Sequence, residues 1–280
     1  MRGLYRAGWA AGAGLPEPAV RALLTAASRA AVRRDGQHVR QLRRNLEAAT
    51  GAPVDDVLLR AAVASHLRNV YETLALPGWS RPHIAELVTT NDLTALRTAR
   101  QTRGAVLALP HSGNWDLAGA WACLHDLPVS TVAEQLADPD FRAFTHFREG
   151  LGMEVWSHRD RTVMAALADA VRRGRVVCLL ADRDLSGTGL PVRWGPHAVT
   201  MPAGPALLAR RTGALLFPVV STFTNRGMHL EVGEAIEPQP RPEGLQAMTQ
   251  QVADVFAQAV AARPQDWHML QPFFPAEEPA

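Results

Sequence analysis

The sequence predicts an α/β protein with a largely parallel central sheet that is flanked by helices and preceded by an N-terminal helical segment. Two observations predict this fold class. Apolar residues recur at helical spacing through most of the first 100 residues, and from residue 104 onward short apolar runs alternate with helical stretches. With 47% hydrophobic and 20% charged residues, the 280-residue chain can bury a sizeable core. We therefore expect one domain over 1–280, made of a helical part, 1–100, and an α/β core, 104–270.

Three helical segments are expected in the N-terminal part, at 17–34, 38–51 and 54–76. All 29 basic residues of the chain are arginines, and the formal net charge is only +2, so the arginine content by itself does not indicate phosphate recognition. The arginines on the first two segments are Arg21, Arg29, Arg33, Arg34, Arg40, Arg43 and Arg44. They form either a solvated helix surface or a surface that lies on anionic lipid, because basic amphipathic helices favour that setting.

The core is expected to alternate strands with helices. The apolar runs predict strands at 105–110, 129–134, 153–156, 176–182, 214–220 and 229–236. The intervening patterns predict helices near 114–124, 138–150, 160–173, 202–212 and 243–262. Ligands of such sheets bind outside the carboxyl ends of the strands, and His111 follows the first of these strands.

Several classes of protein and site are disfavoured. The opening residues lack the sustained apolar stretch of a signal peptide, and no window approaches 18 consecutive apolar residues. Cys123 and Cys178 have no metal-type spacing and suggest no disulfide framework. The chain has no G-x-S-x-G elbow, dinucleotide fingerprint or P-loop. If this protein acts on membranes, we expect it to act from the surface.

The stretch HSGNWDLAG (111–119) sets Asp116 five residues after His111, at the mouth of a predicted strand. Two residues at this spacing within one helix are about 140° apart, so they would not meet. If His111 lies in the turn before the helix, Asp116 could hold one ring nitrogen and leave the other free as a base. The alternative is a structural helix cap.

Further polar residues follow neighbouring strands. Asp182, Arg183 and Asp184 lie at the carboxyl end of the strand expected at 176–182 and either form a strand-end salt bridge or supply a second carboxylate for His111. A metal site is disfavoured because the histidine and aspartates form no compact ligand array. Glu134 and Arg148 lie on neighbouring loops of the same sheet.

Five blocks of the chain, in order, resemble one known family. They are HSGNWDLAG, FREGLGMEV, ADRDLSGTG, MPAGPALLARRTGA and ARPQDWHMLQPFF. The sequence resembles the bacterial lysophospholipid acyltransferase-like superfamily over nearly its whole length. Within it, the chain is most similar to the phosphatidylinositol mannoside acyltransferases of actinobacteria, relatives of the late acyltransferases of lipid A synthesis.

The resemblance implies roles for individual residues. It implies that His111 is the catalytic base, that Asp116 orients it, and that Asp184 is an acidic residue in contact with it. It also implies that Glu134 and Arg148 shape the site around the acceptor and the thioester. We expect Asp182 and Arg183 to join them as substrate-binding residues.

The resemblance further implies transfer of a long acyl chain from acyl-CoA, as co-substrate, to a mannose hydroxyl of a phosphatidylinositol mannoside. No metal, other cofactor or nucleic-acid partner is expected, and the protein would work peripherally on the cytoplasmic side of the cell membrane. Two alternatives stay open. The acceptor could be another glycolipid or a lipid A-like molecule, or the chain could be a non-catalytic lipid-binding homologue.

Overall fold

The computed structural model describes residues 16–134, 145–185, 187–241 and 243–275. It confirms the α/β class with a seven-stranded sheet in the order β1-β9-β8-β2-β5-β3-β4. The strands are β1 (Val88–Thr90), β2 (Ala105–Leu109), β3 (Val129–Ala133), β4 (Glu154–Ser157), β5 (Val176–Leu180), β8 (Leu215–Phe223) and β9 (Met228–Val232). Five of them run parallel, whereas β9 is antiparallel to β8 and β1 is parallel to β9.

Central strand β2 shows why this part of the chain forms a parallel sheet. All five of its residues are buried, as expected for a strand with helices over both faces. Val106 and Ala108 belong to the core cluster that includes Leu208 of α10 and Phe256 of α11. Leu107 points to the opposite face and packs in a cluster with residues of α6.

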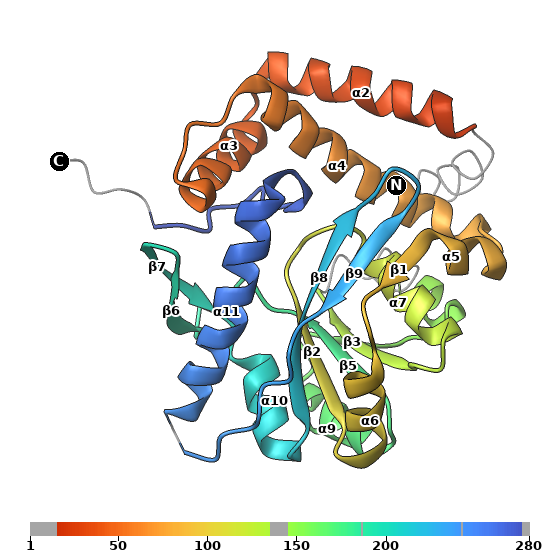
Figure 1. Ribbon diagram of the computed structural model, residues 1–280, viewed down its shortest axis with the longest axis vertical. Helices are drawn as coiled ribbons and strands as arrows, with labels where there is room; N and C mark the ends of the chain where they lie inside the picture. The colour runs from red at the N-terminus through yellow and green to blue at the C-terminus, as the bar shows by residue number, and fades with distance from the viewer. Residues whose placement is uncertain (1–15, 135–144, 186, 242, 276–280) are drawn as a thin grey trace.

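The helices cover the sheet on both faces and at one end (Figure 1). They are α2 (Glu17–Arg34), α3 (Gln37–Thr50), α4 (Asp56–Ala75), α5 (Arg81–Leu87), α6 (Thr94–Thr102), α7 (Trp115–Leu124), α9 (Val163–Arg172), α10 (Gly204–Thr212) and α11 (Gly244–Ala262). Helices α9, α10 and α11 contribute to one core cluster, and α6 and α7 contribute to the two on the other face. Helices α2, α3 and α4 lie together at one end of the molecule (Figure 1).

Two features differ from the sequence-based expectation. The part at 1–100 contains β1 as well as helices, and the hairpin β6 (Leu190–Trp194) and β7 (His197–Met201) was not predicted. In this hairpin, buried Val192 and Trp194 alternate with exposed residues, and Gly195 with φ of 59° makes the turn. Residues 145–150 are helical, and the earlier half of the helix expected at 138–150 lies outside the described residues. No helix among the described residues is long and apolar enough to cross a membrane.

Candidate active site

His111 and Asp182 form a hydrogen-bonded pair at the carboxyl edge of the sheet. Strands β2 and β5 are parallel neighbours, with Leu109 opposite Leu180, so the residues two positions beyond each strand end lie side by side. The His111 Nδ1 atom is 2.5 Å from Asp182 Oδ1, and the His111 backbone N–H donates to Oδ2 over 2.8 Å. The carboxylate therefore fixes both the ring and the backbone of His111.

The pairing determines which ring nitrogen of His111 can act as a base. Asp182 is fully buried, and burial raises the pKa of its carboxyl group. The charge of His111 and the hydrogen bonds from His111 and Trp267 outweigh that effect and hold the pKa below its usual value. An ionised Asp182 accepts a hydrogen bond from Nδ1–H, so in the neutral imidazole Nε2 carries the free lone pair.

A C-terminal segment, Asp266–His268, clamps the turn that carries His111. The Trp267 Nε1–H donates to Asp182 Oδ2 over 2.9 Å, and the His268 backbone N–H donates to the His111 carbonyl over 2.7 Å. The Gly113 N–H donates to the Asp266 carbonyl over 3.1 Å. Sequence reasoning did not assign a role to this segment. Its signal was its place in the block ARPQDWHMLQPFF, one of the five that carry the family resemblance.

The side chain of His268 also contacts the turn. Its Nε2 lies 3.0 Å from the carbonyl oxygen of Gly113, which only an N–H can satisfy. Burial, helped by neighbouring His66 and His111, lowers the pKa of His268 to about 3. His268 is therefore a neutral donor to the turn across the physiological pH range.

Asp116 does not occupy the position expected for it. It lies in the first turn of α7 and accepts a hydrogen bond from Arg148 Nε over 2.6 Å, with both side chains buried. The helix begins only at Trp115, after the Asn114 cap accepts from the N–H groups of Asp116 and Leu117. The rotation of α7 directs Asp116 to Arg148, so the prediction that Asp116 holds the His111 ring is corrected to Asp182.

The remaining predicted residues form contacts of their own. Asp184 accepts hydrogen bonds from the N–H groups of Gly187 and Gly189, over 3.2 and 2.7 Å, and so caps its loop. The expected contact of Asp184 with His111 is therefore replaced by that of Asp182. Arg183 forms a 3.2 Å ion pair with Glu134, which joins the ends of β5 and β3. A role of Glu134, Arg148, Asp182 and Arg183 in substrate binding stays a prediction.

A narrow apolar slot begins beside this turn. Its volume is about 80 Å³, and it runs between α7 and the face of the sheet that includes Leu107 and Leu109. Asp116 and Arg148 are among its few polar lining residues. Trp115, which also lines the slot, packs edge-on against the His111 ring with centroids 5.4 Å apart. His111 therefore lies next to a small cavity with a mainly apolar lining.

The described residues hold no group of three or more histidine, cysteine, aspartate or glutamate side chains that could bind a metal ion. A histidine base paired with a carboxylate, beside an apolar slot at the carboxyl edge of a parallel sheet, suits transfer of a lipophilic acyl group to a hydroxyl.

Comparison with known proteins defines the class. The model of the bacterial lipid A biosynthesis acyltransferase family matches residues 2–275. The chain belongs to this family, and so to the acyltransferases.

Two similar proteins carry a more specific name than the family does. The chain is 41% identical over 275 residues to the phosphatidylinositol mannoside acyltransferase of Mycolicibacterium smegmatis, covering 96% of this chain and 89% of that protein. It is also 41% identical over 277 residues to the protein of the same name from Mycobacterium tuberculosis, covering 96% of this chain and 86% of the relative.

Proposed function

We propose that this protein transfers a long acyl chain from acyl-CoA to a mannose hydroxyl of a phosphatidylinositol mannoside. The observation that carries the proposal is the His111–Asp182 pair beside an apolar slot, which Trp115, in contact with the His111 ring, helps to line. The acceptor is taken from the names of the relatives, which are 41% identical over 96% of this chain.

His111 supplies the base that this reaction needs. A sugar hydroxyl has a pKa far above 7, so it attacks a thioester only if a base removes its proton in the transition state. Nε2 of His111 takes that proton as the hydroxyl oxygen forms a bond to the thioester carbonyl carbon. The carbon–sulfur bond then breaks, coenzyme A leaves as its thiolate, and His111 returns the proton to the sulfur. Asp182 stabilises the transient imidazolium.

The apolar slot and Arg148 bind the acyl-CoA donor. The acyl chain would enter the apolar slot between α7 and the sheet, with its thioester near Trp115, Asp116 and Arg148, which also line this slot. Arg148 can stabilise negative charge on the carbonyl oxygen, and Asp116 holds its guanidinium in place. We expect acyl-CoA to be the co-substrate with no separate cofactor, because the thioester already carries an activated acyl group.

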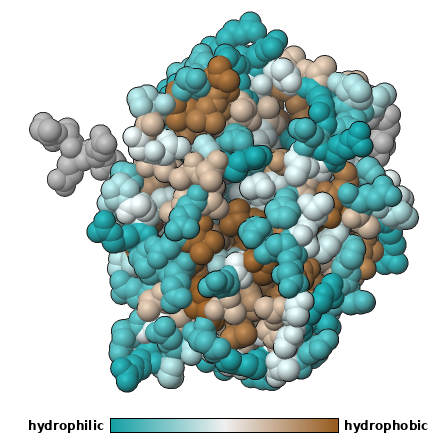
Figure 2. Space-filling view, in the orientation of Figure 1, coloured by the Kyte–Doolittle hydropathy of each residue, from teal (hydrophilic) through white to brown (hydrophobic). Residues whose placement is uncertain are grey.

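Membrane contact is assigned to the N-terminal helices. Figure 2 shows a hydrophobic patch near the top of one face, over these helices and beside hydrophilic residues. On α2, Leu23 is 60% exposed, and Arg29 and Arg33 are also exposed. Apolar and cationic groups on one helix suit the surface of an anionic lipid layer. We therefore propose that the protein works peripherally on the inner face of the cytoplasmic membrane, with lipid and acyl-CoA rather than nucleic acid as partners.

A different acceptor is the second candidate function, because the matching family is named for lipid A biosynthesis. The same base and slot would serve another glycolipid or a lipid A-like hydroxyl. A non-catalytic lipid-binding role is less well supported, since the His111–Asp182 pair would then have no use.

The test follows coenzyme A release from palmitoyl-CoA by wild-type protein and His111→Ala, with and without mannosylated phosphatidylinositol. We expect acceptor-dependent release, a lipid product heavier by one palmitoyl group in mass spectrometry, and loss of both in the variant. Release without acceptor dependence would assign another acceptor or a thioesterase. Equal and negligible release from both proteins, repeated with other donors and acceptors, would refute catalysis.

A further inference from the structure

A second, larger cavity lies between the N-terminal helices and the turn that joins β8 to β9. Its volume is about 540 Å³, which is in the range of small-ligand sites. Its walls come from α2, α4, α5 and the β8–β9 turn at 224–227. Among its lining residues are three arginines, Arg21, Arg68 and Arg226, and the aromatic rings of Tyr71 and Trp79.

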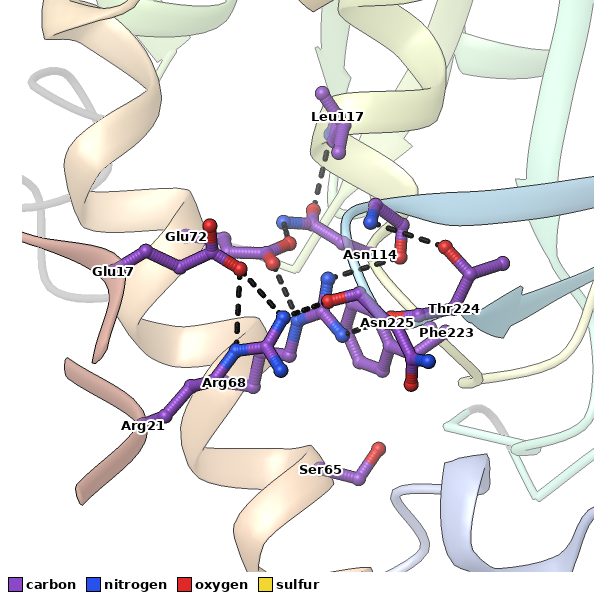
Figure 3. A network of polar contacts seen from close by, with 12 residues as sticks. Glu17, Arg21, Ser65, Arg68, Glu72, Asn114, Leu117, Phe223, Thr224 and Asn225 are labelled. Atoms are coloured by element: carbon purple, nitrogen blue, oxygen red, sulfur yellow. Dashed lines mark hydrogen bonds and ion pairs between the residues drawn. The ribbon is translucent and has the colours of Figure 1, made fainter. Parts of the chain in front are cut away.

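The wall of this cavity is hydrogen-bonded to the turn that carries His111 (Figure 3). Arg68 donates to Glu72 over 2.6 Å and to the carbonyl oxygens of Thr224 and Gly227 over 2.7 and 2.9 Å. Glu72 in turn accepts from Asn114 Nδ2 over 3.2 Å, and Asn114 caps α7. These bonds hold the cavity at a fixed position relative to the candidate active site.

The two cavities flank one helical turn. Trp115 and Asp116 line the apolar slot, and Asn114, just before them, is bonded to Glu72 of the second cavity. The slot has a mainly apolar lining, whereas the lining of the second cavity combines cations with aromatic rings. A base at this turn is therefore placed between a site for an apolar group and a site for a polar one.

The charges of the second cavity favour an anion. Arg21 is paired with Glu17 and bonded to the carbonyl oxygen of Asn225, and Arg68 is paired with Glu72. Arg226 has no ion pair among the described residues, so its charge is available to a ligand. A cavity lined by guanidinium groups and aromatic rings suits a phosphate attached to a hydroxylated ring.

We propose that the second cavity binds the phosphate-bearing polyol headgroup of the acceptor lipid and so holds the sugar to be acylated near His111. This assignment rests on the proposed function. Coenzyme A also carries a phosphorylated ring, but the rim of the cavity favours a lipid. Leu24 lines the cavity on α2, and Leu23, about 100° around the same helix, is 60% exposed, so an apolar side chain for contact with lipid lies on a helix that forms the cavity wall.

Calorimetric titration tests the site without turnover. The probes are myo-inositol 1-phosphate, adenosine 3′,5′-bisphosphate and inorganic phosphate, added to the full chain as wild type, Arg226→Gln and Arg211→Gln. Arg211 is an exposed arginine of α10 that lines neither cavity and serves as the matched control. We expect inositol phosphate to bind more tightly than either other probe. Arg226→Gln should weaken it about tenfold, the loss of one charge-assisted hydrogen bond, and Arg211→Gln should not change it.

Kinetics separate the two sources of phosphate. Arg226→Gln should raise KM for mannosylated phosphatidylinositol about tenfold and leave KM for palmitoyl-CoA unchanged. A rise in KM for palmitoyl-CoA alone, tighter binding of adenosine bisphosphate than of inositol phosphate, or equal effects of both arginine variants would overturn the proposal. If inositol phosphate binds as expected but no glycolipid is acylated, the proposed function fails and the binding site stands.

Discussion

Replacing Trp267 by phenylalanine isolates the hydrogen bond that its indole gives to Asp182. Trp267 and Trp194 are both 1% exposed and stack with ring centroids 5.6 Å apart. Of the two, only Trp267 donates to the Asp182 carboxylate, over 2.9 Å. Trp194 Nε1 has no hydrogen-bond partner among the described residues. Trp194→Phe is thus a matched control, because it removes the same ring system from the same aromatic stack without touching the His111–Asp182 pair.

The expected size of the effect follows from that one bond. A hydrogen bond to a charged group contributes about 1.5–3 kcal/mol, and 1.4 kcal/mol is a factor of ten, so Trp267→Phe should lower kcat about tenfold to a hundredfold. Trp194→Phe should stay within about twofold in kcat, because its indole gives no hydrogen bond to Asp182. Its stability should change little, since the lost packing is offset by removal of a buried unpaired N–H. Coenzyme A release at saturating substrates measures kcat, and urea unfolding measures stability. Full kcat in Trp267→Phe, or an equal loss of kcat in Trp194→Phe, would refute the reasoning.

Three further outcomes are expected. Gly113→Ala should lower Tm and activity far more than Gly51→Ala. Both glycines have a positive φ, 56° and 66°, but only at Gly113 would an added Cβ lie 2.7 Å from Ser221 Oγ. Equal losses of Tm in the two variants would argue against a strained turn. His268, with its pKa lowered to about 3 against 6.5 when unfolded, contributes stability that is fully present above pH 6.5 and is lost as pH falls toward 3. Between pH 7.5 and 5.5 wild type should therefore lose roughly 1 kcal/mol more unfolding free energy than His268→Gln in urea titrations, and identical pH dependence would contradict a buried neutral histidine. Ala118→Leu, at a buried wall of the slot, should lower kcat/KM for palmitoyl-CoA much more than for butyryl-CoA, and an equal loss for both donors would place the chain elsewhere.

The sequence predicted the sheet and the position of His111 because both depend on local patterns. The continuous apolar run of β2 indicates a strand that is buried on both faces, and a residue just past its carboxyl end must lie at the ligand-binding edge. Strand β1 was missed because it has only three residues, too few to show a period within a helical region.

The partner of His111 could not be chosen from the sequence. Asp182 and Asp184 stand two positions apart after the same strand, and the choice between them is made by the register of β5 against β2, which places Leu180 opposite Leu109. The hydrogen bond from Trp267 to Asp182 could not be predicted from the sequence either, since the two residues are 85 positions apart in the chain. Asp116 was wrongly assigned to His111 because the direction of its side chain depends on the residue at which α7 begins. That residue is Trp115, and sequence patterns do not fix a helix end this closely.

The central claim is that Asp182 is the carboxylate that makes His111 a base. The most direct measurement compares acyl transfer to mannosylated phosphatidylinositol by Asp182→Asn and Asp184→Asn, two substitutions of the same kind on the same loop. In Asp182→Asn the side-chain amide favours the wrong tautomer of His111, so kcat should fall about 10³- to 10⁴-fold, as removal of the orienting carboxylate does in catalytic triads. Asp184→Asn, which touches the loop amides of Gly187 and Gly189, should stay within about tenfold of wild type. Near-normal activity in Asp182→Asn, or a larger loss in Asp184→Asn, would contradict the account.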